Sequence, residues 1–222
     1  SVRDRHAPGQ YAHTVNADPR RNPTGRELLI RLPDWLPEAL PPEDAAPAAA
    51  ERRMQLAVEL AGANVRRGTG GPFAAVVFEI ATGRLLAAAV NVVLPSRCCL
   101  AHAETLALGI AQQRIGSQDL SVADGGAELV TSVEPCGMCL GAVAWSGVGR
   151  LVCGARETDA TAVGFDEGPK PADWPGALAA RGIEVVRDVL RDEARAVLAE
   201  YARRDGVIYN GRGETGRERS TS

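Results

Sequence analysis

The chain has 222 residues, of which 45% are hydrophobic and 24% are charged, and this composition is typical of a globular protein with one core. The net charge of -3 argues against a protein built mainly to bind nucleic acid, because such proteins usually carry a basic surface. The longest apolar runs are too short to cross a bilayer, and the first residues lack the apolar stretch of a secretory signal. We therefore expect a cytoplasmic protein without a membrane anchor.

Residues 1–43 are rich in proline and arginine, as in "DPRRNPTG" and "LPPEDAAP". Proline at this density prevents regular helix, so the sequence predicts an extended N-terminal arm. Trp35 and Leu36 are candidates within it for docking onto an apolar groove. We expect the beginning of this arm to be a solvated tail. The alternative is a local basic arm that contacts a partner, because residues 1–31 contain six arginines.

Residues 44–211 are predicted to form one domain, beginning with a helix over 48–68. In this stretch Met54, Ala57, Val58 and Ala61 recur at a spacing of three and four residues, and Gly68 stands where a C-terminal cap is expected. Two strands joined by a turn follow at 71–80 and 85–91.

The rest of the domain alternates between helical and strand patterns. We predict helices at 102–114, after Pro135, at 174–181 and at 188–206, strands at 127–132, 150–155 and 182–186, and a loop at 157–172. Alternation of this kind predicts an α/β sandwich around a mostly parallel or mixed sheet. Residues 212–222 are predicted to be a flexible C-terminal tail.

The five cysteines are an odd number in a chain expected to be cytosolic, which favours metal or catalytic use over disulfides. Catalytic zinc takes three protein ligands and leaves one position for water. His102, Cys136 and Cys139 can supply the three, because a Cys-x-x-Cys pair on the first turn of a helix projects to one side and its thiolates are stabilised by the helix dipole. Glu104 would then stand beside the metal as a general acid and base.

Two alternatives use the same cysteines differently. A structural zinc site needs a fourth ligand, for which Cys98, Cys99 and Cys153 are the remaining thiols. A redox pair would need neither His102 nor Glu104. We expect Cys98 and Cys99 to be small buried residues that line the pocket, since a fourth thiolate ligand would displace the water.

The signature H-x-E followed by P-C-x-x-C is typical of zinc-dependent base deaminases. Residues 102–104 read "HAE" and residues 135–139 read "PCGMC", so the chain resembles the cytidine deaminase superfamily. The resemblance implies a three-layer α/β/α sandwich around a five-stranded mixed sheet, with both motifs on central helices. It also implies one catalytic Zn²⁺ per subunit.

Other segments narrow the resemblance. "GGPFAAVVFE" at 70–79, "EPCGMCLGAVAWSGV" at 134–148, "GFDEGPKP" at 164–171 and "DGVIYNG" at 205–211 are similar to bacterial guanine deaminases of this superfamily, including a subgroup that takes guanine and ammeline. By this resemblance Glu167 holds the base and assists proton transfer. The substrate-binding residues that it implies, by stacking or by hydrogen bonds to the ring, are Phe73, Asn91, Trp145, Asp166 and Tyr209.

The resemblance implies hydrolytic deamination of guanine to xanthine and ammonia, and aminotriazines such as ammeline are further candidate substrates. The alternative is deamination of a nucleoside or of a specialised metabolite, with a substrate of the guanosine, cytidine or triazine type. A tRNA adenosine deaminase would need a basic surface, and a non-enzymatic zinc module would have no use for Glu104. We expect a small nucleobase as partner, no nucleic acid and no membrane. The resemblance also implies a homodimer, with C-terminal segments that could be exchanged between subunits.

Overall fold

The computed structural model describes residues 28–42 and 50–210, and its centre is a sheet of five strands in the order β2-β1-β3-β4-β5. β1 runs antiparallel to both β2 and β3, whereas β3, β4 and β5 are parallel, so the sheet is mixed. The strands are β1 (Ala74–Glu79), β2 (Leu85–Val90), β3 (Ala127–Val133), β4 (Arg150–Ala155) and β5 (Glu184–Val186).

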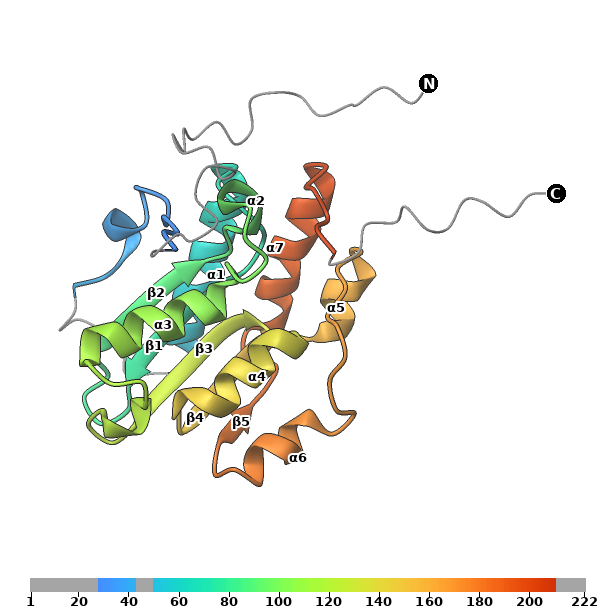
Figure 1. Ribbon diagram of the computed structural model, residues 1–222. Coiled ribbons are helices and arrows are strands. Elements are labelled where there is room, and N and C mark those ends of the chain that lie inside the picture. Colours follow the sequence, from blue (N-terminus) through green and yellow to red (C-terminus); the bar gives the residue numbers. More distant parts are fainter. Residues whose placement is uncertain (1–27, 43–49, 211–222) are drawn as a thin grey trace, which may run out of the picture.

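Helices cover both faces of the sheet, which makes three layers (Figure 1). One face carries α1 (Ala50–Arg66) and α7 (Arg191–Arg203), with α5 (Glu157–Ala162) packed on α7. The other face carries α3 (Ala103–Ile115), α4 (Gly137–Ser146) and α6 (Trp174–Ala179). Short turns of helix complete the described chain: η1 (Pro37–Ala39), α2 (Val93–Ser96) and η3 (Leu120–Val122). The predicted α/β/α sandwich around a five-stranded mixed sheet is confirmed.

The sheet is apolar on both sides because each layer of helices needs its own core. Along β1, Ala74, Val76 and Phe78 face the α1 and α7 side, while Ala75 and Val77 face the α3 and α4 side. This alternation follows from the two-residue period of a strand. All six residues of β1 are buried, as expected for a strand covered on both faces.

The first predicted helix is confirmed as α1, and its four predicted apolar residues are buried in one core cluster. Gly68 has φ +63°, a left-handed conformation that suits a glycine just after a helix.

The predicted loop at 157–172 was wrong over its first part, where α5 forms. The Asp159 carboxylate accepts from the Arg156 backbone N–H, which caps this short helix in place of an apolar pattern.

Part of the predicted N-terminal arm packs against the domain. Leu36 is 3% exposed and belongs to the core between α1 and the sheet, so its predicted docking is confirmed. The domain boundary predicted at residue 43 therefore separates residues that share one core. The predicted flexible tail at 212–222 lies outside the described residues, as do residues 1–27 of the predicted arm.

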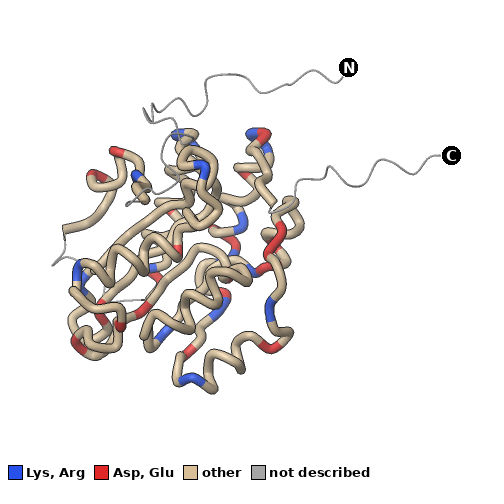
Figure 2. The backbone as a smooth tube through the Cα atoms, viewed as in Figure 1, with Lys and Arg blue, Asp and Glu red and all other residues tan. Residues whose placement is uncertain are grey.

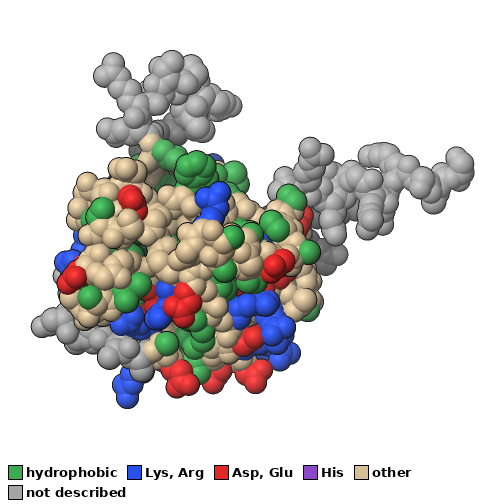
Figure 3. Space-filling view, turned by 90° about the horizontal axis from the view of Figure 1, so that it is seen from below, with side chains coloured by type: hydrophobic (Ala, Val, Ile, Leu, Met, Phe, Trp, Pro, Cys, Tyr) green, Lys and Arg blue, Asp and Glu red, His purple; other side chains and the backbone are tan. Residues whose placement is uncertain are grey.

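None of the helices that the structure describes is both long and apolar enough to span a membrane. Charged residues lie mostly at the ends of elements and in loops, and the central strands and α4 carry few (Figure 2). The face seen from below carries acidic and basic side chains interspersed (Figure 3). Among the described residues on this face, acidic side chains therefore interrupt the basic ones, unlike a continuous basic stripe that binds a phosphate backbone.

Candidate active site

The two sequence motifs meet where α3 and α4 begin. His102 is the N-cap residue of α3, and Cys136 is the N-cap residue of α4, just after β3 and Pro135. Both residues have extended backbone conformation before the helix turns start. Cys139 lies one turn along α4 from Cys136, on the same side of the helix. The predicted placement of both motifs on central helices is confirmed.

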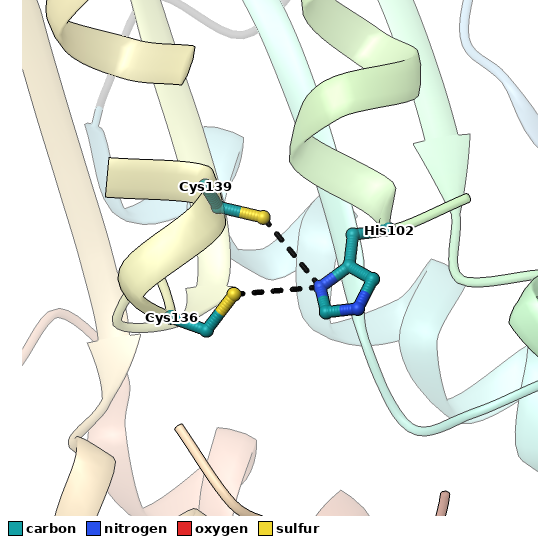
Figure 4. Close-up of side chains that lie close together, drawn as sticks. All are labelled: His102, Cys136 and Cys139. Carbon is teal, nitrogen blue, oxygen red and sulfur yellow. Dashed lines mark hydrogen bonds between the residues drawn. The ribbon is translucent and has the colours of Figure 1, made fainter. Parts of the chain in front are cut away.

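The three predicted metal ligands point toward one another (Figure 4). Their ligand atoms all lie within 4.8 Å, and no other group of three such residues occurs among the described residues. The Nδ1 atom of His102 lies 3.6 Å from Sγ of Cys136 and 3.5 Å from Sγ of Cys139. Tetrahedral zinc, with bonds of about 2.05 Å to nitrogen and 2.3 Å to sulfur, separates these atoms by about 3.6 Å. The donor set therefore fits zinc, and Nδ1 is the ligand nitrogen that the geometry selects.

The hydrogen bond between the two thiols of this cluster shifts their pKa values in opposite directions. A hydrogen bond from Cys139 lowers the pKa of Cys136 to about 4, and the bond to His102 also lowers it. The same hydrogen bond and burial raise the pKa of Cys139. Burial lowers the pKa of His102, but its bond to Cys136 and the nearby Glu104 raise it more. Because metal binding needs both thiolates and a neutral imidazole, binding would release protons.

Two buried carboxylates face the cluster. Burial raises the pKa of Glu104, and the Cys136 thiolate raises it further. Burial also raises the pKa of Glu167 to about 8, with further contributions from Cys136 and Glu104. The backbone carbonyl of Glu167 accepts from the N–H of Gly137 at 2.8 Å, which fixes the Glu167 loop on the first turn of α4. Buried carboxyls with raised pKa values in one pocket are typical of acid-base catalysis.

Aromatic side chains form one wall of this pocket. Phe73 and Phe165 contact edge to face with ring centroids 4.9 Å apart, and Tyr209 packs against Phe165 at 5.3 Å. All three line the pocket together with His102, Cys136 and both carboxylates. Phe73 and Tyr209 are therefore brought to the site as the sequence predicts. A flat ring can stack on such a wall, because aromatic faces tolerate many heterocycles.

Asn91 lies behind this wall and Asp166 lies at its rim. Asn91 is 1% exposed, its backbone N–H donates to the Phe73 carbonyl, and its Oδ1 accepts from Val93 N–H at 3.2 Å. Asp166 lines the pocket, and its carboxylate accepts from the Gly168 N–H at 2.8 Å. The backbone N–H of Asp166 donates to Asn210, which ties the pocket rim to the C-terminal segment.

Trp145 does not line the pocket, which corrects the predicted role. Its side chain is 84% exposed near the end of α4. It stands nine residues after Cys136, which is two and a half helical turns, so the helix carries it to the opposite side. The aromatic character of Trp145 was therefore a misleading signal for the substrate site.

The remaining cysteines are not ligands of the cluster in the described chain. Cys153 is fully buried in the core between β4 and the α3 and α4 layer. Cys98 packs at the edge of the other core cluster, and Cys99 is exposed. Neither Cys98 nor Cys99 lines the pocket, so their predicted place there was wrong.

Sequence reasoning missed two pocket residues. Phe165 is the central aromatic of the wall, and it stands in the quoted segment "GFDEGPKP" beside the predicted Asp166. Glu134 lines the pocket just before Pro135 and is 3% exposed. Its carboxylate accepts from Arg187 Nε at 2.6 Å and from the Glu157 N–H at 2.9 Å. The signal for Glu134 in the sequence was its position, a glutamate at the end of an apolar strand.

The cluster and the pocket agree with the family comparison. Residues 47–155 match the model of the cytidine and deoxycytidylate deaminase zinc-binding region, which includes all three residues of the cluster and Glu104. The chain belongs to this deaminase family. Membership of a zinc-binding family and the fit of His102, Cys136 and Cys139 together support zinc as the metal.

Relatives within the family are named guanine deaminases. The chain is 38% identical to the guanine deaminase of Bacillus subtilis over 53% of this chain and 71% of that protein. A solved guanine deaminase from Nitrosomonas europaea is 52% identical, with a TM-score of 0.75, over 81% of this chain and 98% of that one. A structure in complex with 2,6-diaminopurine is 52% identical, with a TM-score of 0.74, over 82% and 96% of the two chains.

Proposed function

We propose that this protein deaminates guanine to xanthine and ammonia. The observation that carries the proposal is the pair of buried carboxylates, Glu104 and Glu167, that face the His102, Cys136 and Cys139 cluster inside one aromatic pocket. A cytidine-type substrate offers fewer ring N–H groups to a second carboxylate than a purine lactam does. The relatives named guanine deaminases and the complex with 2,6-diaminopurine support a purine with a 2-amino group.

In this proposal the metal cluster and Glu104 carry out the chemical step. His102, Cys136 and Cys139 would hold zinc, which would supply the Lewis acid that makes water nucleophilic at neutral pH. Glu104 takes one proton from the attacking water and passes it to a ring nitrogen beside C2, and it then carries the remaining proton of the new hydroxyl to the leaving amine. The C–O bond forms at C2 and the C–N bond breaks, so that the water oxygen becomes the new carbonyl and ammonia leaves. One ion per subunit is expected.

The substrate-binding residues hold the ring for this step. Phe73 stacks on the base together with Phe165, which the structure adds to the predicted set. Asn91 lies behind the wall, and its role at the lactam edge of the ring is the one that the family resemblance implies, whereas Glu167 and Asp166 line the pocket and accept from the N–H groups of the ring. Tyr209 closes the pocket from the C-terminal segment. Trp145 has no task in the pocket because it is exposed.

The test is the reaction of guanine in water enriched in ¹⁸O. Hydrolytic attack at C2 places one labelled oxygen in xanthine, with ammonia released in equal amount. Guanosine, ammeline and cytidine are run beside guanine, since a nucleoside or aminotriazine substrate is the alternative. Absence of xanthine, or xanthine without the label, would refute the proposal.

A homodimer is the second part of the proposal, and exchange of the C-terminal segments stays a prediction. The exposed side of α3 and α4 supports it, because α4 carries no charged residue and Trp145 and Leu100 are 84% and 52% exposed. Light scattering of the native protein should give twice the mass of one chain. The Trp145→Glu substitution should lower the measured mass toward that of a single chain. A monomeric native protein contradicts this part.

A further inference from the structure

A directed chain of hydrogen bonds runs from the N-terminal segment to the wall of the pocket. Trp35 Nε1 donates to Thr69 Oγ1 at 3.1 Å, and the Thr69 hydroxyl donates to Asn64 Oδ1 at 2.7 Å. Asn64 Nδ2 then donates to two carbonyls, that of Gly71 at 2.8 Å and that of Asn91 at 2.9 Å. The chain thus joins residues 35, 64, 69 and 91, which are far apart in the sequence.

Each donor in this chain fixes the orientation of the next group. Because Trp35 can only donate, the hydroxyl hydrogen of Thr69 must point toward Asn64. Because Thr69 donates to Oδ1, the amide of Asn64 is held with Nδ2 facing the two carbonyls. The opposite orientation of the Asn64 amide would set its oxygen against those carbonyls, in a site where the side chain is fully buried.

The carbonyls that Asn64 holds belong to the back of the pocket wall. Asn91 pairs with Phe73 through its backbone N–H, and Phe73 lines the pocket. Gly70 allows this close approach, since a Cβ there would collide with the Asn91 carbonyl. A Cβ at Gly71 would likewise collide with the Tyr209 hydroxyl. Because residues 70 and 71 are both glycines, no side chain at these positions sets the distance between the pocket wall and Asn64.

We propose that Trp35, Thr69 and Asn64 are positioning residues that set the place of Asn91 for substrate binding, so that the N-terminal segment 28–42 is part of the substrate-binding machinery. The segment is anchored at this point, because Leu36 enters the core and Arg67 lies over the Trp35 ring at 5.3 Å. The inference rests on the proposed function for the role of Asn91.

The test compares two substitutions at one position in the zinc-loaded, full-length protein. Thr69→Ser keeps a hydroxyl that can accept and donate, whereas Thr69→Val has nearly the same shape as threonine and does neither. We expect Thr69→Val to raise KM for guanine about five- to tenfold with kcat nearly unchanged, and Thr69→Ser to stay near the native value. Trp35→Phe should raise KM in the same direction, and the double variant Trp35→Phe, Thr69→Val should add little to Thr69→Val alone.

Hydrogen exchange gives a readout that does not depend on turnover. The Val93 amide donates to Asn91 Oδ1, so Thr69→Val should speed its exchange about tenfold relative to Thr69→Ser, with β3 and β4 unchanged. Equal KM values and equal exchange in the two variants would overturn the inference, and so would faster exchange throughout the sheet. A native protein that fails to turn over guanine would instead refute the proposed function, while the exchange comparison still decides the positioning role.

Discussion

Glu167 is expected to destabilise the zinc-free folded protein at neutral and higher pH. Its pKa in the folded protein is about 8, against an ordinary value of 4.5, chiefly because of burial. Between these pH values the unfolded chain loses the proton first, so the free energy of unfolding falls as the pH rises and levels off above about pH 8. At about 1.4 kcal/mol per pH unit, the full cost is at most about 5 kcal/mol.

Glu167→Gln removes this cost because an amide does not ionise. In urea unfolding of the zinc-free protein, we expect the variant to match the native protein near pH 4.5 and to be more stable by a few kcal/mol, about 2 or more, at pH 8.5. Zinc should shrink the difference, since a nearby divalent cation favours the ionised carboxylate. The same stability difference at pH 4.5 and pH 8.5 would refute the reasoning.

Three further substitutions test separate parts of the account. Glu104→Gln should keep one zinc per subunit, measured by metal analysis, and should lower kcat about 10²- to 10⁴-fold, whereas unaltered turnover would exclude Glu104 as the proton carrier. Leu36→Ala should lower the free energy of unfolding by about 2–4 kcal/mol in urea, because it empties a core position, and a change within 0.5 kcal/mol would contradict that burial. Trp145→Ala should leave KM for guanine within about twofold, since the ring is exposed, and a large rise would return Trp145 to the site.

The parts of the fold that sequence predicts are those with a strong local pattern. The apolar spacing of α1, which buries one face, and the continuous apolar runs of β1 and β2, which are buried on both faces, are visible in the residues alone. α5 lacks such a pattern, because only Ala160 of its six residues is buried. Its start depends on the backbone N–H of Arg156 and the carboxylate of Asp159, a contact that spacing did not reveal.

The candidate site divides in the same way. The ligand positions follow from short spacings at two helix starts, so His102, Cys136 and Cys139 could be predicted together. The pocket wall is built from segments distant in sequence, and an aromatic residue carries no mark of the side it will face. Trp145 was therefore placed wrongly and Phe165 was missed, although both lie within quoted motifs.

The hydrogen-bonded side chains behind the pocket wall are the part of the site that is least predictable from the sequence. Asn64 lies in the last turn of α1, where an asparagine would ordinarily be expected to face solvent, yet it is fully buried because Thr69 and two backbone carbonyls satisfy its amide. These partners come together only when the N-terminal segment, α1 and the strand ends are folded. No spacing rule connects Trp35 with Asn91.

Ammonia release from the zinc-loaded protein, measured with guanine, guanosine, ammeline, adenine, cytosine and cytidine, tests the central claim most directly. We expect fast release from guanine that disappears on removal of zinc and returns when zinc is restored, with little release from cytidine. Release from another amine while guanine stays inert would keep the zinc chemistry and contradict the roles given to Asn91 and Glu167. Release from guanine that is unaffected by complete loss of zinc would contradict the account at its centre.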